Sequence, residues 1–284
     1  MILFNTEKYK YLADELPHKK GNLVRKKFDD GEHYIRIDTK LEDEDVYILG
    51  GTISDHDTMD IYDLACACVM YGAKSLHLVI PYFGYSTMER AVKGGEVVKA
   101  KTRARLLSSI PKATEGNYIH LFDVHSEGIV HYFEDGLKSR MMSSDSLFSD
   151  IIKQYPEAVL ASPDAGRAKT VETLASKFNR DVALVLKRRD GNKISHTAIN
   201  ADVEGKNVII YDDMIRSGNT LIAAAKAYKS NGAKRIIVLS SHGLFTNHKL
   251  LDTELIEHFY VTNSHPNSNI KHDKLTIISM KELI

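Results

Sequence analysis

The sequence is short of cysteine and has no excess of charge of either sign, and each shortage excludes a class of protein. Only Cys66 and Cys68 occur among 284 residues, and in a helix-like apolar stretch this spacing puts them on different faces. Neither a disulfide nor a zinc site is expected, and the thiols are predicted to pack in a core. Basic and acidic residues number 38 each, so no broad basic field favours nucleic acid or an anionic membrane as partner.

Long apolar runs are also absent. No stretch approaches the length of a membrane span, and residues 1–6 lead into a charged segment without a basic leader or cleavage site. A cytoplasmic location is therefore predicted. No Gly-x-x-x-x-Gly-Lys-Ser/Thr string occurs, which excludes a kinase with that phosphate loop. With 43% hydrophobic residues and no low-complexity tract, the chain is expected to be globular, with one large or two ordinary domains.

The most informative segment covers residues 208–221. Val208 to Tyr211 is typical of a buried parallel strand, and residues 219–231 are typical of a helix. Asp212 and Asp213 then follow the strand, at the edge where open α/β sheets bind ligands. The carboxylates are predicted to accept hydrogen bonds from sugar hydroxyls, and the loop N–H groups to hold a phosphate. The predicted phosphate ligands are Ser217, Gly218, Asn219 and Thr220. A simple turn in which Asp and Ser cap the helix also fits these residues.

An earlier part of the chain has the same plan. A strand from Val46 and a helix over about 58–71 end at Gly72-Ala73-Lys74, before another apolar strand. In the second half, the helix after the 208–211 strand ends at Gly232-Ala233-Lys234 before a strand over 235–239. The nearly equal spacing predicts a duplicated α/β domain. Only the second copy has the acidic loop, so the two halves are expected to have different functions.

The domain boundary is predicted near residues 138–147, which are polar and unpatterned. This gives an N-terminal domain of residues 1–142 and a C-terminal domain of residues 143–284. The last residues of the chain are expected to pack back on the N-terminal domain.

Six segments, in order along the chain, resemble the ribose-phosphate diphosphokinase family, also called PRPP synthetases. They are Phe28 to Ile37, Ile80 to Tyr85, Phe122 to His125, Ser162 to Gly166, Lys187 to Arg189 and the 208–221 segment. The resemblance implies two duplicated type I phosphoribosyltransferase-like domains, each a mostly parallel sheet flanked by helices. It also implies the reaction, in which the C1 hydroxyl of ribose 5-phosphate takes the diphosphoryl group of MgATP. The products are 5-phosphoribosyl 1-diphosphate (PRPP) and AMP.

The resemblance also implies roles for single residues. Lys187 and Arg189 would clamp the transferring group on a mobile loop. The expected ATP-binding residues are Phe28, Asp30, Glu32, Arg90 and His125. The expected Mg²⁺ residues are His125, Asp164 and Asp123, and ribose 5-phosphate would bind Asp212, Asp213 and the 217–220 loop. Simpler interpretations stay open: Phe28 in the core, Asp123 to His125 as a strand-end turn, and Lys187 with Arg189 on a solvated strand end.

The sequence departs from the common family pattern at several positions. Thr87 and Met88 stand where the family has Arg and Gln contacts to ATP, and the surrounding residues look more like plant-type class II enzymes. Arg216 replaces a common acid, which leaves its role open. Lys40 and Glu42 stand where class I enzymes have the Ser and Arg of a phosphate/ADP regulatory site. Because Glu42 would repel phosphate, weak regulation is predicted.

Two rival functions share part of the pattern. A phosphoribosyltransferase that consumes PRPP would have the 208–221 motif, but the duplicated domain and the Phe28 loop disfavour it. A non-catalytic regulatory subunit of the synthetase type could lose the cations and metal residues, yet Lys187, Arg189, His125 and Asp164 are all present. In the family the Phe28 loop comes from a neighbouring subunit, so a homo-oligomer, either a dimer or a hexamer, is implied.

Overall fold

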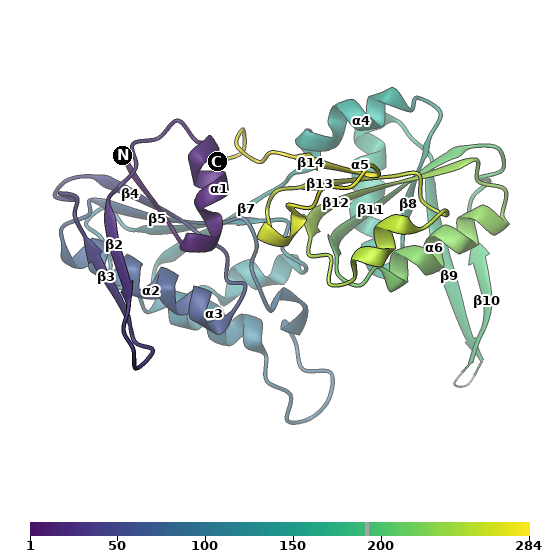
Figure 1. Cartoon of the computed structure of the whole chain (residues 1–284). Helices are drawn as coiled ribbons and strands as arrows, with labels where there is room; N and C mark the ends of the chain where they lie inside the picture. The colour runs from purple at the N-terminus through teal and green to yellow at the C-terminus, as the bar shows by residue number, and fades with distance from the viewer. Residues whose placement is uncertain (191–192) are drawn as a thin grey trace. The chain divides into compact units, whose positions relative to one another are not determined.

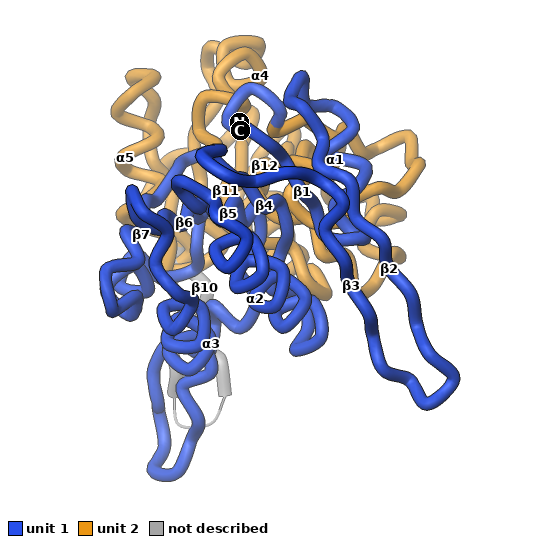
Figure 2. The backbone as a smooth tube through the Cα atoms, turned by 90° about the vertical axis from the view of Figure 1, so that its left-hand side faces the viewer, with its two compact units in different colours: residues 1–143, 281–284 blue, residues 144–280 orange. Residues whose placement is uncertain are grey.

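The computed structural model describes residues 1–190 and 193–284, but no side chain between 186 and 198. The chain forms two compact units (Figure 2). Unit 1 holds residues 1–143 together with 281–284, and unit 2 holds residues 144–280. In the part of the chain that the structure describes, no helix is long and apolar enough to cross a membrane.

Unit 1 is built on a five-stranded parallel sheet (Figure 1). In spatial order its strands are β1 (Ile2–Asn5), β4 (Asp45–Leu49), β5 (Ser75–Ile80), β6 (Asn117–Phe122) and β7 (Leu137–Met142). An antiparallel hairpin of β2 (Leu23–Lys27) and β3 (His33–Ile37) forms a separate sheet. The helices are α1 (Lys10–Glu15), α2 (Asp55–Met70) and α3 (Lys99–Ser108), with 3₁₀ turns η1 (Glu7–Tyr9), η2 (Ser86–Met88) and η3 (Glu127–Tyr132).

The two faces of the unit 1 sheet differ in what they bury. Strands β4, β5, β6 and β7 follow one another across the sheet in chain order. Right-handed crossovers between such parallel strands place the connecting elements α2, α3 and η3 on the same face of the sheet. That face forms the core, in which Leu76, Leu78 and Ile80 of β5 pack with helix residues. Alternate residues of a strand point the other way. On this second face the His77 ring stacks between Tyr47 and Tyr118, with ring centroids 4.3 and 4.7 Å away.

Helix α2 begins earlier than the sequence pattern predicts because Ser54 caps it. The Ser54 Oγ accepts a hydrogen bond from the Asp57 N–H at 3.2 Å, and Asp55 and Asp57 lie in the first turn, where negative charge is favoured. Cys66 is half-buried and Cys68 is buried, and both are free thiols, as the sequence predicts.

The described residues of unit 2 form a seven-stranded sheet in which β9 and β10 pair antiparallel and the other pairings are parallel. In spatial order the strands are β10 (Lys193–Ile199), β9 (Val182–Asp190), β8 (Val159–Ser162), β11 (Asn207–Ile215), β12 (Arg235–Gly243), β13 (His258–Thr262) and β14 (Leu275–Ile278). The helices are α4 (Ser149–Gln154), α5 (Ala168–Phe178) and α6 (Asn219–Ser230). The 3₁₀ turns are η4 (Asp145–Phe148), η5 (Ala165–Arg167), η6 (His248–Asp252) and η7 (Pro266–Ser268). One core cluster packs against α6, and a second packs against α4 and α5.

The two units repeat one order of elements. In each, a first parallel strand (β1 or β8) is followed by a hairpin (β2–β3 or β9–β10) and then by four parallel strands. The first strand pairs with the first of those four in both units. The units differ in that β9 joins the main sheet while β2–β3 stays separate. The duplicated domain predicted from the sequence is therefore present.

Two segments differ from the sequence-based expectation. Residues 138–142, expected to be unpatterned, belong to β7, an edge strand that pairs with β6 and has mostly exposed side chains. Its weak hydrophobic pattern follows from that position. Strands β11 and β12 run to Ile215 and Gly243, further than the apolar runs predict, because they continue to pair with each other beyond the end of β8.

Candidate active site

The acidic pair of unit 2 lies in the last part of β11. Asp212 pairs in register with Ser240 of β12, beyond the segment that pairs with β8. Asp213 is 4% exposed, and its N–H donates to Asp212 Oδ1 at 3.0 Å. Neither residue caps α6, whose N-cap is Gly218. The capping interpretation of the two aspartates is therefore wrong.

Arg167, at the end of η5, holds the acidic pair. Its Nη2 lies 2.5 Å from Asp213 Oδ2, and its Nε lies 3.9 Å from Asp212 Oδ1. Burial raises the pKa of the Asp212 carboxyl well above its usual range, and the Asp213 carboxylate raises this pKa further, while Arg167 opposes both. Sequence reasoning missed Arg167. The available signal was a cation three residues after Asp164, at the end of a neighbouring parallel strand.

The loop after β11 leads into the N-terminus of α6. Gly218 has φ +77°, and a Cβ at this position would overlap the side chain of Leu250. Glycine is therefore required both by the backbone conformation and by the contact. Within the described residues no side chain caps the helix, and Asn219 and Thr220 are exposed. The first-turn N–H groups are thus left without a side-chain cap, and they offer an anion donors at the positive end of the helix dipole.

Asp164 follows β8 and caps η5. Its Oδ1 accepts a hydrogen bond from the Gly166 N–H at 2.9 Å. Its charge contributes to the raised pKa of Asp212, so the two carboxyl groups lie in one electrostatic environment. The structure therefore brings together Asp164, Asp212 and Asp213 from the ends of two adjacent strands.

The expected catalytic cations lie on β9 in the second hairpin. By backbone register, Lys187 pairs with Thr197, and Arg189 pairs with Ile194. The side chains of Lys187 and Arg189 lie outside the described residues, and their catalytic role stays a prediction.

The expected nucleotide loop forms the tip of the β2–β3 hairpin in unit 1. Phe28 is 50% exposed and meets only the edge of Tyr34 among the described rings, at 6.2 Å between centroids, so its assignment to the core is wrong. Asp30 Oδ1 accepts from the Glu32 N–H at 3.0 Å. The tip is a turn that exposes one aromatic ring and three carboxylates, Asp29, Asp30 and Glu32, to solvent.

Of the remaining expected residues of unit 1, Asp123 and His125 follow β6, and Arg90 follows η2. Asp123 adopts a left-handed φ of +40°, and its N–H donates to the Met142 carbonyl at 3.1 Å. His125 follows two residues later, after the buried Val124. Arg90 is exposed, and its Nε lies 3.5 Å from Glu89. The Tyr132 hydroxyl of η3 donates to the Glu89 carbonyl at 2.6 Å, which ties the segment before Arg90 to the segment after His125.

A magnesium ion fits the donor chemistry of these residues. In the described part of the chain, no three His, Cys, Asp or Glu side chains gather as a complete metal cage. Mg²⁺ commonly binds through one or two carboxylates, waters and substrate phosphates instead. Asp123 after β6 in unit 1 and Asp164 after β8 in unit 2 are half-buried carboxylates, and each suits that mode of binding.

Comparison with known proteins adds to this geometry. Residues 1–110 match the family described as the N-terminal domain of ribose phosphate pyrophosphokinase, and residues 157–284 match the phosphoribosyl synthetase-associated domain. A ribose-phosphate pyrophosphokinase of Mycoplasma genitalium is 31% identical over 95% of this chain and 84% of its own length. One of Prochlorococcus marinus is 32% identical over 96% of this chain and 85% of its own length.

A solved structure shows the same fold. The phosphoribosylpyrophosphate synthetase from Mycobacterium smegmatis superposes with a TM-score of 0.86 at 24% identity, over 99% of this chain and 95% of that one. Together with the two matching domains and the sequence relatives, this makes the chain a member of the ribose-phosphate pyrophosphokinase family.

Proposed function

We propose that this chain transfers the diphosphoryl group of ATP to the C1 hydroxyl of ribose 5-phosphate. The hydroxyl oxygen forms a bond to the β-phosphorus, and the bond from that phosphorus to the α–β bridging oxygen breaks. AMP leaves, and the hydroxyl proton passes to solvent. Membership of the ribose-phosphate pyrophosphokinase family supports this reaction.

The observation that carries the proposal is the end of β11 in unit 2. There, the Asp212–Asp213 pair is held by Arg167, and an uncapped helix N-terminus follows within a few residues. The carboxylates suit the ribose hydroxyls, because an ionised carboxylate only accepts hydrogen bonds. The N–H groups of Ser217, Gly218, Asn219 and Thr220 suit the 5-phosphate.

The transferring group needs positive charge, which Lys187 and Arg189 would supply. Arginine binds a phosphate through a planar fork, and lysine acts as a point charge. Mg²⁺, for which Asp164, Asp123 and His125 are the expected ligands, would neutralise charge on the triphosphate. The exposed ring of Phe28 suits an adenine, with Asp30 and Glu32 as acceptors. A homo-oligomer and a cytoplasmic location belong to the same proposal.

One assay tests the reaction directly. Purified protein is mixed with ribose 5-phosphate, MgCl₂ and ATP, and AMP and PRPP are quantified separately. We expect the two products to form one to one. ADP with a ribose bisphosphate, or no turnover with any nucleoside triphosphate, would refute the reaction. The control is Asp213→Asn, which removes the nearer of the two carboxylates that pair with Arg167 and should abolish turnover.

A further inference from the structure

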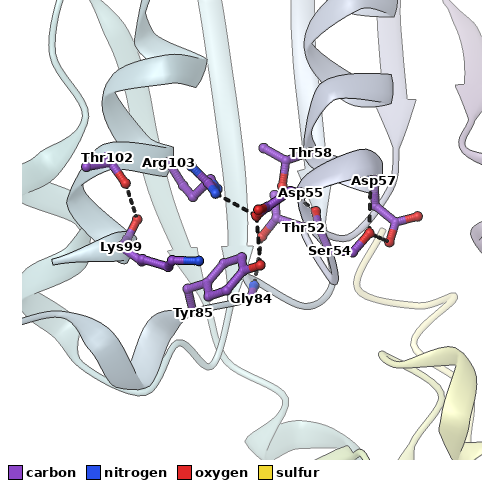
Figure 3. A network of polar contacts seen from close by, with 10 residues as sticks. All are labelled: Thr52, Ser54, Asp55, Asp57, Thr58, Gly84, Tyr85, Lys99, Thr102 and Arg103. Atoms are coloured by element: carbon purple, nitrogen blue, oxygen red, sulfur yellow. Dashed lines mark hydrogen bonds and ion pairs between the residues drawn. The ribbon is translucent and has the colours of Figure 1, made fainter. Parts of the chain in front are cut away.

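Two cations of α3 gather at the turn that follows β5 (Figure 3). Lys99 Nζ lies 4.6 Å from the centroid of the Tyr85 ring, and the guanidinium carbon of Arg103 lies 5.3 Å from it. Residues four apart on a helix share one face, so both side chains reach the same turn. Arg103 Nη2 lies 2.5 Å from Asp55 Oδ1, which also accepts from the Tyr85 hydroxyl at 2.7 Å. Two positive charges thus lie against the Tyr85 ring, and one of them pairs with Asp55.

Arg103 has donors that its surroundings do not use. Its side chain is 19% exposed, and its Nε is buried without a hydrogen-bond partner among the described residues. A guanidinium carries five N–H donors, and a desolvated donor without an acceptor costs free energy. Asp55, by contrast, is 64% exposed, and exposed ion pairs contribute little to stability. A second anion can therefore bind Arg103, beside Asp55 or in its place, with little loss of stabilising free energy.

The turn that carries Tyr85 is rigidly built. Tyr85 has a left-handed φ of +61°, which a non-glycine residue adopts only where its surroundings enforce it. Gly84 donates its N–H to Thr52 Oγ1 at 2.7 Å, and a Cβ on Gly84 would overlap the Thr52 carbonyl (Figure 3). Backbone strain of this kind is frequent at binding sites. The turn lies at the carboxyl ends of β4 and β5, the ligand-binding edge of a parallel sheet.

The three residues directly after Tyr85 carry no charge, and the charged residues that follow, Glu89 and Arg90, pair with each other. Thr87 is neutral, and Met88 is 44% exposed. We propose that Lys99 and Arg103 bind the phosphate chain of the donor nucleotide, and that Asp55 occupies Arg103 until the nucleotide arrives. A phosphate offers more acceptor oxygens than a carboxylate and can pair with both N–H groups of the arginine fork. The proposal rests on the proposed function, because the donor nucleotide is its substrate.

A structural role is the alternative that the test must separate. If the Arg103–Asp55 pair only clamps α3 to α2, then removing either partner should have the same effect. Arg103→Leu and Asp55→Asn are therefore compared. Arg105→Leu is the matched control, because Arg105 lies on the same helix and pairs with Glu134 at 3.5 Å instead.

Steady-state kinetics give the first readout. We expect Arg103→Leu to raise KM for ATP at least tenfold and to change KM for ribose 5-phosphate less than twofold. Lys99→Gln should raise KM for ATP severalfold, and Arg103→Lys should recover part of the loss. Asp55→Asn should leave KM for ATP unchanged or lower it. Equal increases for Arg103→Leu and Asp55→Asn, or for Arg103→Leu and Arg105→Leu, would overturn the proposal.

Calorimetric titration separates this proposal from the proposed reaction. The probe is α,β-methylene-ATP, whose α–β linkage resists transfer, and AMP is the comparison ligand. Arg103→Leu should weaken binding of the analogue at least tenfold and of AMP less than threefold. Equal weakening of both, or no binding of the analogue to the wild-type protein, overturns the phosphate-binding role. Binding without turnover would overturn only the reaction.

Discussion

At the scale of single residues, the acidic pair of β11 shows how one cation can distinguish two neighbouring carboxyl groups. Asp213 is buried yet keeps Arg167 as a partner at 2.5 Å, whereas Asp212 has this cation only at 3.9 Å. The pKa of Asp212 is raised by burial and by Asp213. A substrate hydroxyl that donates to Asp212 competes with a proton for the same oxygen.

Loss of the loop cation Lys187 should slow the chemical step rather than weaken substrate binding. Lys187 is proposed to meet charge that develops during transfer, so Lys187→Ala should lower kcat at least about a hundredfold with a small change in KM. Initial rates at varied ATP and ribose 5-phosphate measure this. Lys153→Ala, which removes a cation paired with Asp150 on α4, should leave both constants unchanged. A raised KM with an unchanged kcat would contradict the assigned role.

The His77 cluster should make unit 1 less stable in mild acid. Burial lowers the pKa of His77 from 6.5 to about 4, His120 and Arg140 contribute in the same direction, and Asp45 opposes them. As the pH falls below 6.5, His77 of the unfolded chain binds a proton, whereas His77 of the folded chain binds one only near pH 4. Stability is therefore lost across that window, by roughly 1 to 2 kcal/mol once partial exposure is discounted.

His77→Gln tests this pH dependence, because glutamine does not titrate. Urea unfolding of both proteins at pH 8 and pH 5 gives the comparison. The wild type should lose more unfolding free energy between the two pH values than the variant. Equal losses would show that another group carries the acid sensitivity.

Single residues of the site divide into those that sequence can locate and those that it cannot. Asp212 and Asp213 follow an apolar run directly, and Gly218 precedes a helical pattern, so local pattern places all three. Arg167 and Arg103 act through partners far along the chain, at Asp213 and Asp55. No local pattern carries such pairings, because the topology of the sheet creates them.

At the scale of elements, the start of α6 depends on Gly218. Gly218→Ala should destabilise unit 2 in two ways, through the left-handed φ of +77° and through overlap with Leu250. Gly205→Ala is the matched control, because Gly205 has φ +68° and open space around its Cβ position. We expect the control to cost about 1 kcal/mol and Gly218→Ala to cost about 1 to 3 kcal/mol more. Urea midpoints measure the difference, and equal costs would contradict the contact argument.

Elements with strong periodicity were predictable and those at edges were not. Helix α6 begins at Asn219 and ends at Ser230, within one residue of the prediction from its pattern. The hairpin β2–β3 mixes charged and apolar residues and is half exposed, and its equivalence with β9–β10 emerges only from strand order. This equivalence puts the exposed Phe28 turn and the Lys187 segment on corresponding hairpins of the two units.

At the scale of the whole molecule, activity should not require inorganic phosphate. Lys40 and Glu42 pair with each other at 3.0 Å beside a cavity of about 200 Å³. A carboxylate there repels phosphate and costs roughly tenfold or more in affinity. Rates with and without phosphate should agree, and ADP should compete only with ATP.

The double change Lys40→Ser with Glu42→Arg tests whether these two residues are what prevents phosphate from binding. It replaces the internal ion pair with a hydroxyl and a cation, so it should create a response to phosphate. Rates at increasing phosphate, at saturating ATP, measure this response. Strict dependence of the wild-type enzyme on phosphate would contradict the prediction.

Unit 1 is made from two stretches of chain, because residues 281–284 belong to it while residues 144–280 form unit 2. During synthesis on the ribosome, domains generally fold as they emerge, the N-terminal domain first. Unit 1 therefore has to wait for its last segment until all of unit 2 has been translated. The half of the protein that is made first is the half that is finished last.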